Sequence, residues 1–230
     1  MKFVLTKKPK NPIIILGIPS LSLVGILSTK YLLDHLDVDE IGNIESSDII
    51  PMTAIHKSKL VNPITIYYNQ KYNLVIIQSI TEVTGHEWDL AKTIMEVANT
   101  LSAKEMVLIE AMPPHEGEMK IYYYSTKKKL KLDPIKEAVI AGPAASLLLE
   151  AKSIPVTCLF AEVHSQLPDY EAAAKIVESL DDYLGLKIDF KPLMETAKKF
   201  ENSLKQVMEK QKRAVESMSQ KEKKELSYFG

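Results

Sequence analysis

The side chains best suited to chemistry in this sequence are five acidic and histidine residues: Glu110, His115, Glu116, Glu162 and His164. Glu110 ends one expected strand, and Glu162 and His164 follow another, near the carboxyl edge at which open sheets place their ligands. Gathered there, these groups could bind zinc or share a proton. Neither His-x-x-x-His nor His-x-His occurs, however, and His115 lies in a Pro-Pro-His-Glu-Gly loop. Solvated loop residues are therefore the simpler interpretation, and a metal-dependent or hydrolase-type enzyme is the alternative.

A second candidate site is the turn Gly17-Ile18-Pro19-Ser20, which separates an apolar run from a helical pattern. Backbone N–H groups at the start of a helix can hold a small anion, so Gly17, Pro19 and Ser20 could form the lip of a small-ligand site. Any α/β fold needs such a turn for structural reasons alone. The stretch has neither the Lys of a P-loop nor a G-x-G-x-x-G match, and no G-x-S-x-G elbow supports a nucleophilic Ser. We expect neither a cofactor nor a bound metal.

Charge and composition exclude several classes of partner. Lys plus Arg total 29 and Asp plus Glu total 30, so the net charge of -1 supplies no long-range field to attract nucleic acid or an anionic membrane. The lysine-rich start precedes an apolar stretch that resembles a signal peptide. Pro12 and Pro19 interrupt this stretch, which is shorter than the roughly 20 apolar residues that cross a bilayer. We expect a cytoplasmic protein that contacts neither nucleic acid nor membrane.

The elements that would position these residues follow from the apolar pattern. Solid apolar runs predict buried strands, and apolar residues at helical spacing predict helices. Strands are expected at 13–16, 40–44, 64–68, 74–78, 106–110, 119–124, 138–140 and 154–160. Helices are expected after the Gly17 turn and at 85–102, 143–152 and 169–184. Buried strands interleaved with helices predict a mixed or parallel sheet covered on both faces, which is a three-layer α/β/α fold.

The last of these helices has the clearest ends. Asp169 follows Pro168 and is a good N-cap, and Gly185 stands where a helix C-cap belongs. Cys158 lies in the apolar run before this helix and is expected to be a buried small hydrophobe.

After Pro192 the sequence becomes polar, and we expect one long helix from about 193 to 224. The chain would then consist of an α/β/α domain, residues 1–190, and a helical extension with a flexible tail, residues 191–230. The less polar positions of the extension form a heptad seam: Leu193, Ala197, Phe200, Leu204, Val207, Gln211, Ala214 and Met218. Up to Leu204 the seam favours packing on the chain's own domain. Beyond Gln206 the thin apolar stripe favours a projecting arm or self-association.

Several stretches together resemble the proteasome assembly chaperone family of archaea and bacteria. They are GIPSLSLVGILSTKYLLDHL at 17–36, QSI at 78–80 and SIPVTCLFAEVHSQLPDYEAAAKIVESLDDYLGLKIDFKPL at 153–193. The positions that match the family pattern are Gly17, Pro19, Val24, Gly25, Ile154, Pro155, Glu162, Pro168, Asp169, Ala172, Leu184 and Gly185. Ser20 and Leu21 stand where a Gly and a small residue are commoner. The resemblance covers about residues 13–193.

This resemblance implies a phosphorylase/hydrolase-like α/β/α fold, no catalytic activity, and homo-oligomers. It also implies an assembly chaperone or ATP-independent activator that binds the α-ring of the proteasome core particle through a C-terminal tripeptide of a hydrophobic residue, Tyr and any residue. The sequence ends Tyr228-Phe229-Gly230, with Tyr228 as the hydrophobe and Phe229 in place of the usual Tyr. Two aromatic rings and a terminal carboxylate suit insertion into a pocket that contains a Lys. The expected partners are core-particle α-subunits and further copies of this chain.

Overall fold

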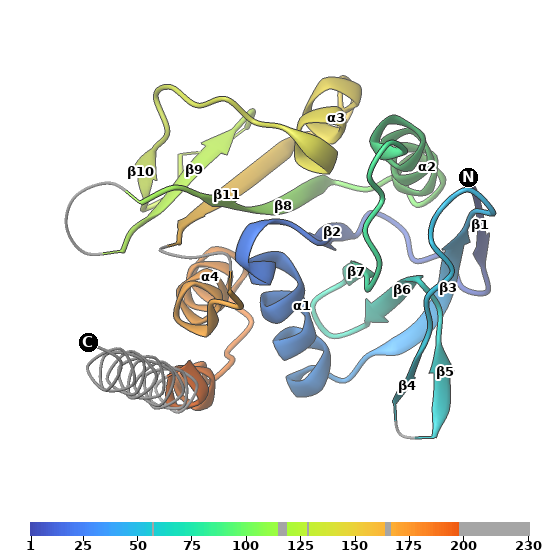
Figure 1. Ribbon diagram of the computed structural model, residues 1–230, viewed down its shortest axis with the longest axis horizontal. Helices are drawn as coiled ribbons and strands as arrows, with labels where there is room; N and C mark the ends of the chain where they lie inside the picture. Colours follow the sequence, from blue (N-terminus) through green and yellow to red (C-terminus); the bar gives the residue numbers. More distant parts are fainter. Residues whose placement is uncertain (57, 115–118, 128, 164–166, 198–230) are drawn as a thin grey trace, which may run out of the picture.

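The structure of the protein, a computed structural model, describes residues 1–197 apart from 57, 115–118, 128 and 164–166 (Figure 1). Its elements in chain order are β1 (Lys2–Leu5), β2 (Ile13–Gly17), the 3₁₀ helix η1 (Leu21–Leu23), α1 (Val24–His35), β3 (Asp39–Glu45), β4 (Ala54–His56), β5 (Lys59–Val61), β6 (Ile64–Asn69), β7 (Leu74–Ser79), α2 (Glu87–Thr100), β8 (Glu105–Met112), β9 (Ile121–Ser125), β10 (Asp133–Pro134), α3 (Gly142–Glu150), β11 (Val156–Glu162) and α4 (Tyr170–Leu184). Residues 191–197 add a last helical stretch.

Nine of these strands form one mixed sheet in the order β1-β3-β6-β7-β2-β8-β11-β9-β10. The strands β7, β2, β8 and β11 at its centre are parallel to one another. We call the end of the sheet at which they finish the carboxyl edge. Because β3 and β7 both run antiparallel to β6, β3 also finishes at this edge. The connection from β3 to β6, which contains the separate hairpin β4–β5, therefore lies at the carboxyl edge as well.

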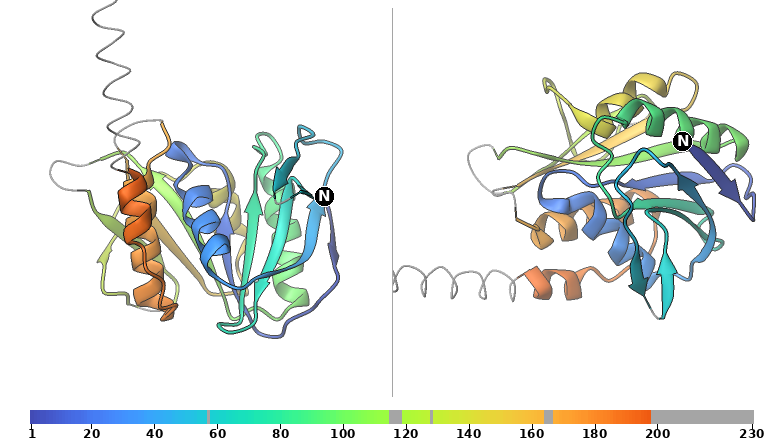
Figure 2. Two further views of the ribbon diagram at one scale, coloured as in Figure 1. Left: turned by 90° about the horizontal axis from the view of Figure 1, so that it is seen from below. Right: turned by 45° about the vertical axis from the view of Figure 1, so that its right-hand side comes forward.

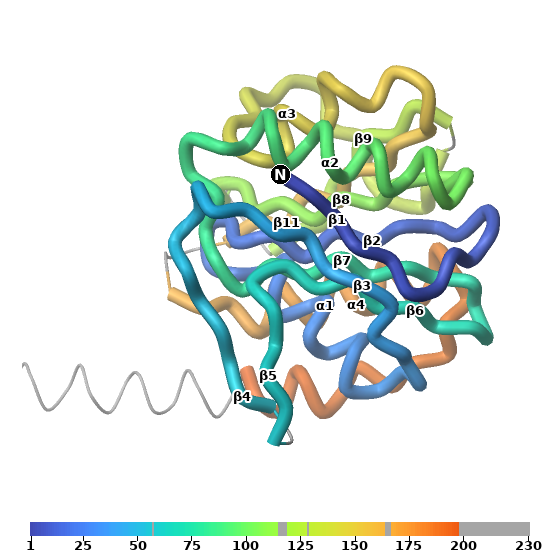
Figure 3. The backbone as a smooth tube through the Cα atoms, turned by 90° about the vertical axis from the view of Figure 1, so that its right-hand side faces the viewer, coloured from blue at the N-terminus to red at the C-terminus, as the bar shows by residue number. Residues whose placement is uncertain are grey.

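Helices cover both faces of the sheet (Figure 3). Helices α2 and α3 pack on one face, and α1 and α4 pack on the other. Strand β2 shows why the central strands read as solid apolar runs: Ile14 and Leu16 belong to the α2–α3 core, whereas Ile15 belongs to the α1–α4 core. A strand covered on both faces needs apolar side chains at every position. The predicted three-layer α/β/α fold with a mixed sheet is confirmed.

One predicted strand is wrong. Residues 138–140 have no regular structure, and the Val139 side chain is fully exposed. This short apolar run is the approach to Gly142, whose φ of 70° opens α3. The strand at this side of the sheet is β10 instead, where Pro134 is tolerated because an edge strand has an unpaired side. Strand β1 and the hairpin β4–β5 were not predicted from the sequence.

Helix α4 begins and ends as predicted. The Asp169 carboxylate accepts a hydrogen bond of 2.9 Å from the Ala172 N–H, and Gly185 closes the helix with a φ of 67°. Cys158, on the strand before this helix, is fully buried, which confirms that prediction too.

Residues 191–197 run back along the domain toward the carboxyl edge (Figure 2). Leu193 and Ala197, the first two positions of the heptad seam, are buried, which favours packing of this part on the chain's own domain. The rest of the seam, the expected helix up to 224 and the tail Tyr228-Phe229-Gly230 lie outside the described residues. The domain boundary at 190 stays a prediction. Within the described part of the chain, none of the helices combines the length and apolarity that a membrane span requires.

Candidate functional site

The turn between β2 and α1 is built by close packing of backbone. A Cβ on Gly17 would lie 2.0 Å from the Thr29 Oγ1, so a larger residue does not fit beneath α1. Ser22 and Leu23 follow with φ values of 58° and 54°, which are uncommon for residues other than Gly. The Asp169 N–H donates a 3.0 Å hydrogen bond to the Ser22 carbonyl and ties the turn to the start of α4. The turn therefore has a defined shape that other elements maintain.

Gln78 and Gly25, two further positions of the family-like stretches, also help to hold α1 against the end of β2. The Gln78 amide lies within 3.3 Å of the Ile26 carbonyl and 3.4 Å of the Thr29 Oγ1, and it donates to both. A Cβ on Gly25 would lie 3.2 Å from the Ile18 carbonyl oxygen, so Gly25 allows α1 to begin close to the end of β2. These family-like residues thus have a structural explanation that needs no ligand.

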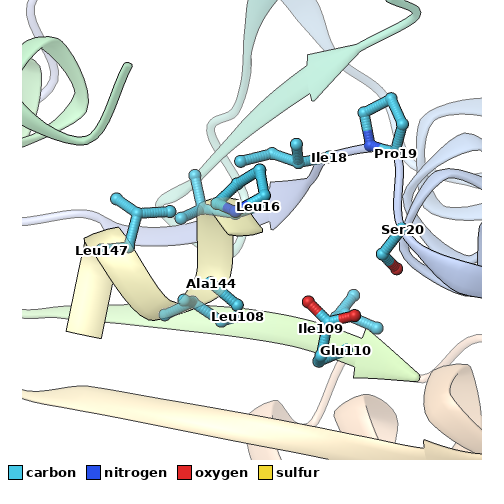
Figure 4. Close-up of a pocket in the computed structure, with 10 residues that line it drawn as sticks. Leu16, Ile18, Pro19, Ser20, Leu108, Ile109, Glu110, Ala144 and Leu147 are labelled. Carbon is cyan, nitrogen blue, oxygen red and sulfur yellow. The ribbon is translucent and has the colours of Figure 1, made fainter. Parts of the chain in front are cut away.

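Ser20 of the candidate ligand turn and Glu110 of the candidate acidic and histidine site face each other across a small cavity (Figure 4). The Glu110 carboxylate accepts a 3.0 Å hydrogen bond from the Ala111 N–H. The Ser20 Oγ is buried and has no partner in hydrogen-bond geometry. Apolar side chains of β2, of the turn after it, of β8 and of α3 line the rest of the cavity, whose volume of about 10 Å³ is roughly the space of one water. A metabolite does not fit in it without movement of these elements.

Burial is the main cause of the pKa shifts of Glu110 and Cys158. It raises the pKa of Glu110, while the Ala111 N–H and the nearby Ser20 hydroxyl favour the ionised carboxylate and oppose the rise. Burial, followed by the negative charge of Glu110, raises the pKa of Cys158 well above its usual value. Because the thiolate is the reactive form of cysteine, a raised pKa makes Cys158 a poor nucleophile.

Glu162 lies at the same edge and is hydrogen-bonded to the backbone just before β9. It is 2% exposed, and its carboxylate accepts a 3.0 Å hydrogen bond from the Lys120 N–H. Glu110 pairs with Phe160 on the neighbouring strand, so Glu162 stands two residues farther along β11. Two of the predicted acidic residues are therefore brought to adjoining strands, each with a backbone N–H as hydrogen-bond donor.

His115, Glu116 and His164 lie outside the described residues. Among the residues that are described, no group of three or more His, Cys, Asp and Glu side chains could hold a metal ion. The hypothesis of a metal-dependent or hydrolase-type enzyme stays a prediction.

A polar network that the sequence did not reveal lies at the opposite end of β8. Glu105 is 3% exposed and accepts hydrogen bonds of 2.6 Å from the hydroxyls of Thr157 and Tyr183. Burial, and then the hydrogen bond to Glu105, raises the pKa of Tyr183 to about 12. The three residues are far apart in the sequence and follow no recognised spacing, so only the packing of β8, β11 and α4 brings them together.

Comparisons with known proteins identify the family. The model of the PAC2 family matches residues 14–208. The chain belongs to the PAC2 family. The family resemblance read from the motifs is thus confirmed. An uncharacterized protein of Methanocaldococcus jannaschii, MJ0106, is 26% identical to this PAC2 chain over 236 residues, with 96% of each sequence covered.

Solved structures agree with the PAC2 assignment. PbaA of Pyrococcus furiosus, described as an archaeal homolog of proteasome-assembly chaperone, matches with a TM-score of 0.82 at 25% identity, covering 96% of this chain and 98% of PbaA. PbaB of the same organism, described as an archaeal proteasome activator, matches with a TM-score of 0.76 at 21% identity, covering 90% of this chain and 98% of PbaB. The match to PbaB shows a shared fold.

Proposed function

We propose that this PAC2-family protein is a non-catalytic proteasome-binding protein, an assembly chaperone or an ATP-independent activator. The observation that supports this most is its similarity to PbaA over nearly the whole length of both chains. The candidate chemical site adds support, because its cavity has room for about one water and its acidic groups accept backbone hydrogen bonds. Binding of a protein partner is the function that remains best supported.

The proposed contact is the last three residues of the sequence, Tyr228-Phe229-Gly230, inserted into pockets of the core-particle α-ring. Two aromatic side chains bury a large apolar area with few rotatable bonds, and the terminal carboxylate can pair with a Lys in the pocket. One tripeptide would bind weakly. A homo-oligomer that presents several tails to a ring would bind far more tightly, because the second and later contacts form at a high effective concentration.

Deletion of Tyr228-Phe229-Gly230 tests this contact. The truncated protein should keep its fold and native mass but lose retention on immobilised core particle, as measured by pull-down and biolayer interferometry. Retention equal to that of the full chain would show that the tripeptide is not the docking element.

A matched substitution sharpens the test. Phe229→Tyr restores the phenol expected at the penultimate position and should add one hydrogen bond, about 0.5–1.5 kcal/mol, or roughly a two- to tenfold gain in affinity. Phe229→Ala, which removes the ring, should weaken binding. An identical affinity for all three side chains would contradict insertion of this residue.

The same complex separates the two roles. An activator should raise peptide hydrolysis by mature core particle, whereas an assembly chaperone should instead raise the yield of core particle from its separate subunits. Native mass spectrometry of the protein alone gives the number of tails that each particle presents.

A further inference from the structure

Exposed apolar side chains gather at one end of the molecule. The described part of the chain has twelve large apolar side chains that are exposed, and eight of them lie in the segments at the carboxyl edge: Leu21, Leu23, Ile50, Met52, Ile55, Leu60, Trp88 and Leu167. The other four are Val4, Tyr124, Val139 and Leu149. Exposed apolar side chains are common singly, whereas several on adjoining residues indicate a surface that binds another molecule.

The hairpin β4–β5 carries the two most exposed of these eight side chains, and they are neighbours. Ile55 and Leu60 are cross-strand partners and are 77% and 71% exposed. The base of the hairpin is held by a 2.9 Å hydrogen bond from the Thr53 hydroxyl to the Val61 carbonyl, and its turn contains Ser58 with a φ of 61°. A two-stranded ribbon is marginally stable on its own in water. A partner surface that covers the Ile55–Leu60 pair would remove its exposed apolar area and fix its position.

The position of residues 191–197, which precede the proposed docking tripeptide, favours the proteasome as the partner of the hairpin. Helix α4 leaves the carboxyl edge, and residues 191–197 return toward it with Leu193 and Ala197 buried against the domain (Figure 2). Residues 198–230, which end in the proposed docking tripeptide, follow from there. The base of the hairpin and the last described residues of the chain therefore lie at the same end of the molecule, although the hairpin itself points to the α1–α4 side of the sheet and not along residues 191–197 (Figure 3).

We infer that the β4–β5 hairpin is a second contact with the proteasome α-ring, beside the pocket that takes the tail. This inference rests on the proposed function. The chemistry of the hairpin defines the receiving surface: an apolar patch for Ile55 and Leu60, with acidic side chains beside it for the exposed Lys59. A second contact on the body also fixes the orientation of the body on the ring, which a tail alone does not.

The test uses the full chain with its tail intact and the substitutions Ile55→Ser and Leu60→Ser together. We expect at least a tenfold loss of affinity for purified core particle, measured by biolayer interferometry, with native mass unchanged. The matched control is Val4→Ser with Leu149→Ser, which removes two exposed apolar side chains from β1 and α3; its affinity should stay within twofold of the unaltered chain. A photo-crosslinker at position 55 should label an α-subunit, and one at position 149 should not.

Two outcomes would overturn the inference. Unchanged affinity in the Ile55→Ser, Leu60→Ser variant would show that the hairpin does not touch the ring. A lower native mass, or a cross-link from position 55 to another copy of this chain, would assign the hairpin to self-association. The proposed function is judged separately, by the tail deletion: if the deletion fails to weaken binding while the hairpin variant does, the body contacts the ring and the tail does not.

Discussion

Strand β8 carries a buried acid at its amino end and a partly buried acid near its carboxyl end, and the two acids are held in different ways. Glu105, at the amino end, accepts hydrogen bonds from hydroxyls on β11 and α4. Glu110, at the carboxyl end, accepts a hydrogen bond from the next residue of its own strand and faces a cavity with a buried, unpartnered hydroxyl. Side-chain hydrogen bonds therefore close the amino end, whereas close backbone packing shapes the carboxyl end. The exposed apolar loops also lie at the carboxyl end, which makes it the end suited to a partner.

The largest expected effect concerns the packing at the carboxyl end. Gly17→Ala should lower the free energy of unfolding by about 3 kcal/mol or more, because its Cβ would overlap the Thr29 Oγ1 and force α1 outward. Denaturant unfolding followed by circular dichroism measures this loss. In a double-mutant cycle with Thr29→Ala, part of the loss should be recovered, since the nearest atom is gone. A cost below about 1 kcal/mol would mean that this end is loosely packed and that close packing does not shape it.

The next effect concerns the amino end. Glu105→Ala should cost about 3 kcal/mol, because it leaves a cavity and removes the acceptor used by two hydroxyls. Glu105→Gln keeps an acceptor oxygen and should cost clearly less. Glu110→Ala should cost less than Glu105→Ala, because the Glu110 carboxylate has fewer hydrogen-bond donors around it. Equal costs at both ends, in the same denaturant experiment, would mean that Glu105 and Glu110 stabilise the fold to the same extent.

Tyr183 gives the amino end a dependence on pH. Its pKa is raised to about 12, so between pH 10 and 12 the folded state holds a proton that the unfolded state has lost. Stability should therefore fall as pH rises through this window. Tyr183→Phe should cost about 1 kcal/mol at neutral pH and should flatten this part of the profile. The difference in tyrosinate absorbance between the two proteins reports the titration; a Tyr183 that ionises near pH 10 would count against the buried network.

The architecture was largely predictable from the sequence, because the central strands and the helices that cover them carry long apolar patterns. The caps of α4 were predictable for a local reason: Asp169 and Gly185 act on backbone groups within a few residues of themselves. The strand expected at 138–140 failed because three apolar residues fit an exposed connection as well as a strand. The hairpin β4–β5 was missed because its short strands have exposed faces, so no burial pattern marks them.

The candidate site was predictable only in part, and for the same physical reason. The positions of Glu110 and Glu162 at the ends of expected strands predicted that both would lie at the carboxyl edge. The sequence did not predict that each carboxylate accepts a hydrogen bond from a backbone N–H, or that Ser20 faces Glu110. These contacts depend on the directions of side chains from separate elements. Glu105 was missed since nothing in its neighbours along the chain indicates burial of its carboxylate.

The smallest expected effect tests the electrostatics of Glu110. Burial raises its pKa, so above the unfolded value near 4.5 the folded state binds more protons than the unfolded state until the raised pKa is passed. Stability should fall as pH rises through that window and then become flat. Glu110→Gln, which keeps an acceptor for the Ala111 N–H, should remove this slope and become more stable relative to the unaltered chain as pH rises above about 4.5. Glu137→Gln, at an exposed position, is the matched control and should leave the slope in place. Identical slopes in all three proteins would show that Glu110 is as well solvated as a surface acid, and the carboxyl end of β8 would then be open to water at its core.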